Sequence, residues 1–266
     1  DINAAVGGTV IASDDVRLTQ DTAPVAYTAG LTDWAAITPG TFYTSPPCAS
    51  AIGDATNALR LDCPDVRIEH SHPFAHVEGV SGRIIAKMVL GSATGRAENY
   101  VSNATVTALY CQAGMNYVNA TAEVGTVRVN GGTTTLRQGG AKGTAFHVAA
   151  GATLNCGRDS AAATVSGTLV LDHADAAIDA VTVNSGGRLI CRKARPATLT
   201  REAGAVLDMS QSDDVFQSGT ININGPVTVI PPRAPSAGTW SGSATVVAPA
   251  GETVTERASF GAAGVA

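Results

Sequence analysis

The most informative stretch of this sequence reads Val181-Thr182-Val183-Asn184-Ser185-Gly186-Gly187, with Leu189 close behind it. Branched apolar residues alternate with polar ones as far as Asn184, and the two glycines then allow the chain to turn before the alternation resumes. A two-residue period is typical of a β-strand with one buried face. The stretch therefore predicts two short strands joined by a glycine corner.

The same pattern recurs along the chain from about residue 100 onward. Clear copies are Val127-Arg128-Val129-Asn130-Gly131-Gly132 and Ile221-Asn222-Ile223-Asn224-Gly225. Successive copies lie 16 to 21 residues apart, and the glycines that mark them are Gly114, Gly132, Gly151, Gly167, Gly186, Gly204 and Gly225. A nearly constant interval is typical of a solenoid, in which each repeat forms one coil stacked on the one before.

Two all-β folds are compatible with these repeats. The first is a right-handed parallel β-helix, a solenoid with irregular N- and C-terminal segments. The alternative is an antiparallel β-sandwich, in which the Asn-Gly dipeptides at 130–131 and 224–225 would form hairpin turns. We favour the β-helix, because a coil of fixed circumference explains the regular interval and a sandwich does not.

The composition excludes several classes of protein. Hydrophobic residues make up 44% of the 266 residues and charged residues only 15%, so the chain has enough apolar surface to fold. The net charge of −5, from 17 basic and 22 acidic residues, argues against nucleic acid as a partner. The longest apolar run, near 84–90, contains Lys87 and is too short to span a membrane. The first residues have neither the basic nor the apolar region of a signal peptide.

The five cysteines are predicted to be buried thiols. Their number is odd, and none of the pairs has the C-x-x-C spacing of a zinc or redox site. Cys156 and Cys191 each follow a repeat glycine by five residues, two repeats apart. In a β-helix they would lie in one column about 10 Å apart, because neighbouring strands are about 4.8 Å apart. That separation is too large for a disulfide, and free thiols are typical of proteins that assemble in a reducing compartment.

The chain divides into three segments. Residues 1–47 lack the repeat and are predicted to form an N-terminal arm or an irregular β segment. Residues 48–230 are predicted to form the β-helix domain, with a short helix over 49–61 that would cap its open end. The Pro-rich run at 231–238 begins a linker and a C-terminal arm or cap over 231–266.

Three groups of residues are candidates for chemistry. His70, His72 and His76, with Glu69, have the residue types of a metal site. Paired carboxylates of the kind that glycosidases use occur at Asp172-His173-Ala174-Asp175 with Asp179, and again at Asp213-Asp214. The one basic run, which could meet an acidic surface, consists of Arg192, Lys193 and Arg195.

For each group the simpler interpretation is a set of solvated side chains on turns. The sugar-stacking aromatic platforms of a glycan site are missing, since aromatic residues are only 5% of the chain. We therefore predict that the chain is not an enzyme, that it needs no cofactor, and that it has no catalytic, cofactor-binding or metal-binding residues.

The step Val181-Thr182-Val183-Asn184-Ser185-Gly186-Gly187 resembles the repeats of self-associating autotransporter adhesins, which form right-handed β-helices. The same style of coil occurs in phage tail spikes and in some phage capsid-decorating proteins. The resemblance covers about residues 100–230 and implies the fold more than the function. Adhesin passengers of this kind are nearly free of cysteine, whereas a virion protein assembled in the cytoplasm can keep its thiols. We therefore favour the phage class.

These observations predict a structural virion protein of a tailed phage, most simply a capsid-decorating protein that acts by surface binding and stabilisation. Its partners would be the major capsid protein or other virion proteins, and the chain would itself form a homo-oligomer, a trimer. Its location would be the virion, after assembly in the host cytoplasm. The alternatives are a tail spike or fibre that binds or cleaves host glycans and an autotransporter-type adhesin. An ice-binding coil is a weaker alternative, for which Thr133-Thr134-Thr135 is the main candidate run.

Overall fold

The chain folds as an all-β parallel solenoid of about eight turns, as predicted. The computed structural model describes residues 15–18, 40–44, 52–53, 58–92, 97–174, 176–194, 196–208, 210–211, 220–224, 228–230 and 245–247. None of these residues lies in a helix, and every strand pairing among them is parallel. The alternative of an antiparallel sandwich is therefore wrong. The chain divides into two compact units, residues 1–141 and 142–266, which are described separately below.

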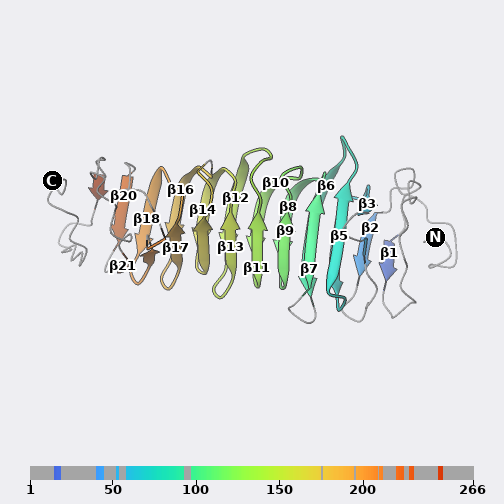
Figure 1. Cartoon of the computed structure of the whole chain (residues 1–266), viewed down its shortest axis with the longest axis horizontal. Coiled ribbons are helices and arrows are strands. Elements are labelled where there is room, and N and C mark those ends of the chain that lie inside the picture. Colours follow the sequence, from blue (N-terminus) through green and yellow to red (C-terminus); the bar gives the residue numbers. More distant parts are fainter. Residues whose placement is uncertain are drawn as a thin grey trace. The chain divides into compact units, whose positions relative to one another are not determined.

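The first unit contains two parallel sheets whose strands lie side by side (Figure 1). One sheet holds, in spatial order, β1 (Asp15–Leu18), β2 (Thr41–Thr44), β4 (Asp65–His70), β6 (Ile84–Ser92), β8 (Thr105–Cys111) and β10 (Glu123–Val129). The other holds β3 (Leu59–Leu61), β5 (Phe74–Gly79), β7 (Glu98–Ser102), β9 (Met115–Val118) and β11 (Thr133–Leu136). Because the chain alternates between the sheets, each coil adds one strand to each of them.

The second unit repeats this arrangement. One sheet holds β12 (Gly143–Val148), β14 (Ser160–Val165), β16 (Ile178–Val183), β18 (Thr198–Glu202), β20 (Thr220–Asn224) and β22 (Thr245–Val247). The other holds β13 (Thr153–Cys156), β15 (Thr168–Leu171), β17 (Arg188–Cys191), β19 (Val206–Asp208) and β21 (Thr228–Ile230).

Columns of identical or similar side chains fill the interior of each unit. In the second unit, Leu154, Leu169, Leu189 and Leu207 are register partners on consecutive strands, and each is at most 3% exposed. The two-residue alternation places these residues inside and their polar neighbours outside. Burial of such a column is the main stabilising contribution available to a solenoid coil.

The repeat glycines lie at the corners between the two strands of a coil. Most of those described have a left-handed backbone, with φ of +67° to +80°, and these are Gly114, Gly132, Gly151, Gly186 and Gly204. Gly167 differs, because there the requirement is space: a Cβ would lie 2.2 Å from the carbonyl oxygen of Ala149. Gly225 lies outside the described residues.

The asparagine before a corner bonds to the preceding coil. Asn184 Nδ2 donates to Ser166 Oγ at 2.9 Å, and Asn130 Nδ2 donates to Gln112 Oε1 at 3.1 Å. The backbone N–H of Asn130 also donates to the carbonyl of Cys111, which continues the parallel ladder. The Asn-Gly dipeptide at 130–131 is therefore a corner of a coil and forms no hairpin.

The predicted helix over 49–61 is wrong for the residues described there. Ile52 forms a parallel bridge with Ala75, and β3 occupies the end of the segment. Leu59 and Leu61 are buried while Arg60 between them is exposed. This alternation fits a strand against the interior, and a helix would turn one of the leucines toward solvent.

Parts of both terminal segments join the sheets. β1 and β2 lie within residues 1–47. They pair with each other, and β2 also pairs with β4 of the predicted β-helix domain. Within residues 231–266, β22 pairs with β20. The Pro-rich run at 231–238 and the remaining parts of the two arms lie outside the described residues.

The described cysteines are free and buried, as predicted. Leu171 separates Cys156 from Cys191 in one interior column, which confirms that they lie two coils apart. Burial raises the pKa of the Cys63 and Cys111 thiols to about 12 and that of Cys156 to about 11. These thiols are therefore uncharged and unreactive in the folded state. Cys48 lies outside the described residues.

Candidate functional site

A polar groove opens on the first unit where β5 ends and the chain turns toward β6. It encloses about 570 Å³, a volume within the usual range for small-molecule sites. Its walls come from the turn at 80–82, from Arg60 of β3 and from the coil corners that precede β8 and β10. Its lining side chains include the carboxylates of Glu78 and Glu123.

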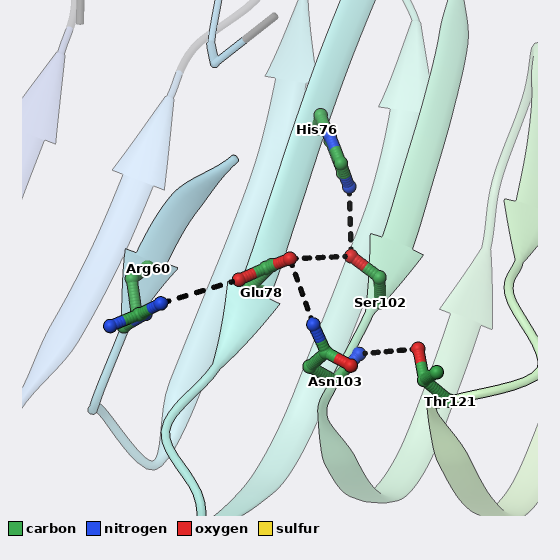
Figure 2. Close-up of polar contacts among 6 residues, drawn as sticks. All are labelled: Arg60, His76, Glu78, Ser102, Asn103 and Thr121. Atoms are coloured by element: carbon green, nitrogen blue, oxygen red, sulfur yellow. Dashed lines mark hydrogen bonds and ion pairs between the residues drawn. The ribbon is translucent and has the colours of Figure 1, made fainter. Parts of the chain in front are cut away.

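Glu78 is the centre of the hydrogen bonds beside this groove (Figure 2). Its Oε1 accepts from Ser102 Oγ at 3.2 Å and from Asn103 Nδ2 at 2.9 Å. The guanidinium of Arg60 lies 3.8 Å from its Oε2. The side chain of Glu78 is only 20% exposed, so these partners hold the carboxylate in one orientation at the edge of the groove.

Asn103 connects the groove to the next coil. Its backbone N–H donates to Thr121 Oγ1 at 3.1 Å, as Figure 2 shows. Its φ of +47° is in the left-handed region, where it is the one non-glycine among the described residues. Asparagine tolerates this backbone better than most residues. The conformation allows its amide to reach Glu78 while its backbone faces Thr121.

His76 and Ser102 form a pair that superficially resembles a base and a nucleophile. The Nε2 of His76 lies 2.8 Å from Ser102 Oγ. The hydroxyl proton of Ser102 is directed to Glu78, so the imidazole donates its Nε2–H to the hydroxyl oxygen. Ser102 is 6% exposed and is not among the groove-lining residues. The pair therefore orients Glu78, and its geometry does not present a nucleophile to a ligand.

A row of aromatic rings lies beside these residues on the outer face of the same sheet. The ring centroids of Phe74 and Tyr100 are 5.2 Å apart and those of Tyr100 and Tyr117 are 4.8 Å apart, and Arg137 lies over Tyr117. The sequence does not reveal this row, because its members are 17 to 26 positions apart and become neighbours only through the strand register. Tyr100 and Tyr117 are stacked, with an interplanar angle of 14°, whereas Phe74 is tilted by 33° against Tyr100.

The predicted histidine cluster is divided among different environments. His70 is buried in the interior and bonds to Asn99, whereas His72 Nδ1 bonds to the backbone of Phe74. His76 bonds to Ser102. Within the described ranges, no three or more His, Cys, Asp or Glu residues are grouped so that they could hold a metal ion.

The predicted carboxylate pairs are likewise separated. Asp172 forms an ion pair with Arg192 at 3.2 Å, while Asp179 forms one with Lys142 at 2.7 Å. Arg192 also donates to Gln211, so these two partners of its side chain lie within its own unit. His173 and Lys193 lie in the turns beside them, and the remaining candidates, Asp175, Arg195, Asp213 and Asp214, lie outside the described residues.

In the part of the chain that the structure describes, there is no helix long and apolar enough to cross a membrane. Comparison of the chain with protein-family models, with curated proteins and with solved structures finds no match.

Proposed function

We propose that this chain is a structural surface protein of a tailed-phage virion, which binds the major capsid protein or other virion proteins and stabilises them. The interior cysteines are the main support for this proposal. Cys156 and Cys191 are held two coils apart, and the pKa of Cys156 is raised by burial, so the fold keeps these groups as thiols. Such an interior suits a protein that folds in a reducing compartment and acts by binding.

The arrangement of the charged residues adds to this support. Asp172 and Asp179, the described members of the predicted carboxylate groups, each pair with a basic residue instead of facing each other. The outer faces of the parallel sheets offer regular rows of side chains, which suit contact with a neighbouring protein.

Immunogold electron microscopy tests this proposal. An antibody raised against the purified chain is applied to phage particles purified from the culture that encodes it. We expect label on the particles, and light scattering of the free chain at two concentrations should give a mass of about three times 26.7 kDa. Label on the bacterial surface in cultures free of phage particles would contradict the proposal and favour the adhesin class.

Glycan binding at the Glu78 groove is a second candidate function. The groove combines carboxylates, the Asn103 amide, hydroxyl groups and the Arg60 guanidinium, and these groups can donate to and accept from vicinal sugar hydroxyls. The hydrogen bonds from Ser102 and Asn103 already orient the Glu78 carboxylate. That preorganisation lowers the entropic cost of binding a polar ligand.

Replacement Glu78→Gln is expected to weaken any glycan binding by about tenfold to a hundredfold, because a charge-assisted hydrogen bond contributes roughly 1.5–3 kcal/mol. Bacterial surface polysaccharides on a glycan array provide the probe, and titration calorimetry measures the affinity for whichever is bound. The matched control is Glu98→Gln, which removes a charge from the aromatic row without touching the groove. Equal affinities for the two variants, or no polysaccharide bound by the wild-type chain, would rule out this function for the groove.

A further inference from the structure

A row of polar side chains runs through the interior of the first unit. It consists of His70 at the end of β4, Asn99 on β7, Asn116 on β9 and Thr134 on β11. Each of them is at most 1% exposed. Asn99 and Asn116 are register partners, as are Asn116 and Thr134, so the row crosses consecutive coils. A column of this kind interrupts the apolar interior that the repeat otherwise builds.

The hydrogen bonds of this row have one direction. Asn99 Nδ2 donates to Asn116 Oδ1 at 2.9 Å, and Asn116 Nδ2 faces Thr134 Oγ1 at 3.5 Å. Asn99 Oδ1 therefore faces His70, whose Nε2 lies 3.0 Å from it. Since that oxygen only accepts, His70 bears its proton on Nε2 in the neutral state.

The other ring nitrogen of His70 is buried without a hydrogen-bond partner among the described residues. In the neutral ring Nδ1 is an acceptor, and an unpaired acceptor has a modest cost. Protonation would place a positive charge and an unpaired N–H donor in the interior, which costs far more.

We propose that His70 makes the first unit acid-labile: its protonation breaks the interior row and opens the coils that contain β4, β7 and β9. The device is a pH-sensitive switch inside the solenoid. It depends on the position of His70 in the row and is independent of the function proposed above.

Among the described residues that face His70, only the hydrogen bond to Asn99 favours the charged ring, and it does not outweigh burial. On β6 its register partner is Ser92, and on β7 its partner is Asn99, both of which are neutral. Thr44 of β2 bonds to the backbone of Glu69, and the Glu69 carboxylate accepts from Arg67 on the outer face. His72, whose ring centroid is 6.5 Å away, adds repulsion when it is charged. Burial and this neighbour lower the pKa of His70 from its usual value near 6.5.

The direction of the pH dependence follows from this shift. The unfolded chain takes up the His70 proton near pH 6.5, whereas the folded chain resists it until a lower pH. The stabilisation is therefore complete above about pH 6.5 and is lost as the pH falls toward the folded-state pKa. In that window the equilibrium constant for opening should rise by up to about tenfold per pH unit.

Hydrogen exchange of the whole chain, read by mass spectrometry from pH 7.5 to 5 and corrected for intrinsic exchange rates, tests the switch. Protection of peptides from β7 and β9 should fall steeply below pH 6.5. The variant His70→Gln retains an N–H donor for Asn99 but does not titrate, so its protection should stay flat. His72→Gln, at the partly exposed ring nearby, removes only the minor repulsion and leaves the burial of His70, so protection should still fall with pH, by slightly less than in the wild type.

A second variant keeps the test decisive if His70→Gln fails to fold. Asn99→Asp would place a carboxylate beside Nε2 and favour the charged ring, which brings the folded-state pKa of His70 closer to its unfolded value, so the loss of protection below pH 6.5 should become smaller. Flat protection in the wild type would overturn the proposal. An unchanged pH dependence in His70→Gln, or in Asn99→Asp where His70→Gln does not fold, would also overturn it.

Discussion

Replacement Gly132→Ala is expected to destabilise the first unit by about 4 kcal/mol or more, a loss found only where a substitution forces a severe local conflict. A Cβ at this corner would lie 2.2 Å from the carbonyl oxygen of Gly114 and 2.7 Å from its nitrogen. Gly114 is the corner glycine of the preceding coil. The new Cβ would therefore clash with backbone atoms, which cannot move aside as a flexible side chain could. The φ of +67° adds about 1–2 kcal/mol for any residue with a Cβ.

The matched control for this prediction is Gly82→Ala in the same unit. Gly82 has a similar φ of +75°, but a Cβ there meets nothing within 4 Å. Gly82→Ala should therefore lower the free energy of unfolding only by the backbone contribution of about 1–2 kcal/mol. Urea denaturation of both variants measures the difference. If Gly132→Ala costs no more than Gly82→Ala, successive corners are not in the close contact described here.

The repeat region could be predicted because its signals are local. Gly132 and Gly186 mark corners by their own chemistry, and alternation identifies the strands around them. The interval between glycines is also sufficient to predict that Cys156 and Cys191 share one column. The antiparallel alternative arose from Asn130-Gly131, since the same dipeptide suits a hairpin and a coil corner alike.

The groove and the interior polar row could not be predicted, because they depend on which residues become register partners. Thr153 and Thr168 pair across 15 residues, whereas Phe74 and Glu98 pair across 24. Because coil length varies in this way, a fixed spacing in the sequence cannot identify the neighbours of Glu78 and His70. The longer early coils also lack the glycine pattern, so the sequence alone predicts a helix for the segment that contains β3.

Replacement Asn116→Asp is expected to destabilise the first unit by about 4 kcal/mol at pH 7.5, although the two side chains have nearly the same shape. Asn116 is 0% exposed and accepts from Asn99 Nδ2, while its own amide donates to the carbonyl of Ala113. In a carboxylate, an oxygen would replace the N–H donor and face the Ala113 carbonyl oxygen. The two acceptors would repel each other at a position that solvent does not reach. Burial of an unpaired charge raises its pKa, so the folded chain must either hold the charge or retain a proton at a cost of about 1.4 kcal/mol per pH unit.

The pH dependence distinguishes this charge effect from a loss of packing. An aspartate with a raised folded-state pKa is penalised only above the unfolded value of about 3.9, so the stability gap to the wild-type chain should shrink as the pH falls. The control is Asn130→Asp, which makes the same change at an exposed corner and should cost less than about 1 kcal/mol at every pH. Denaturant melts of the three proteins at pH 7.5, 6 and 5 measure both gaps. A gap for Asn116→Asp that does not change with pH would mean that the interior row admits water, in which case His70 would also be hydrated and the acid switch would lose its basis.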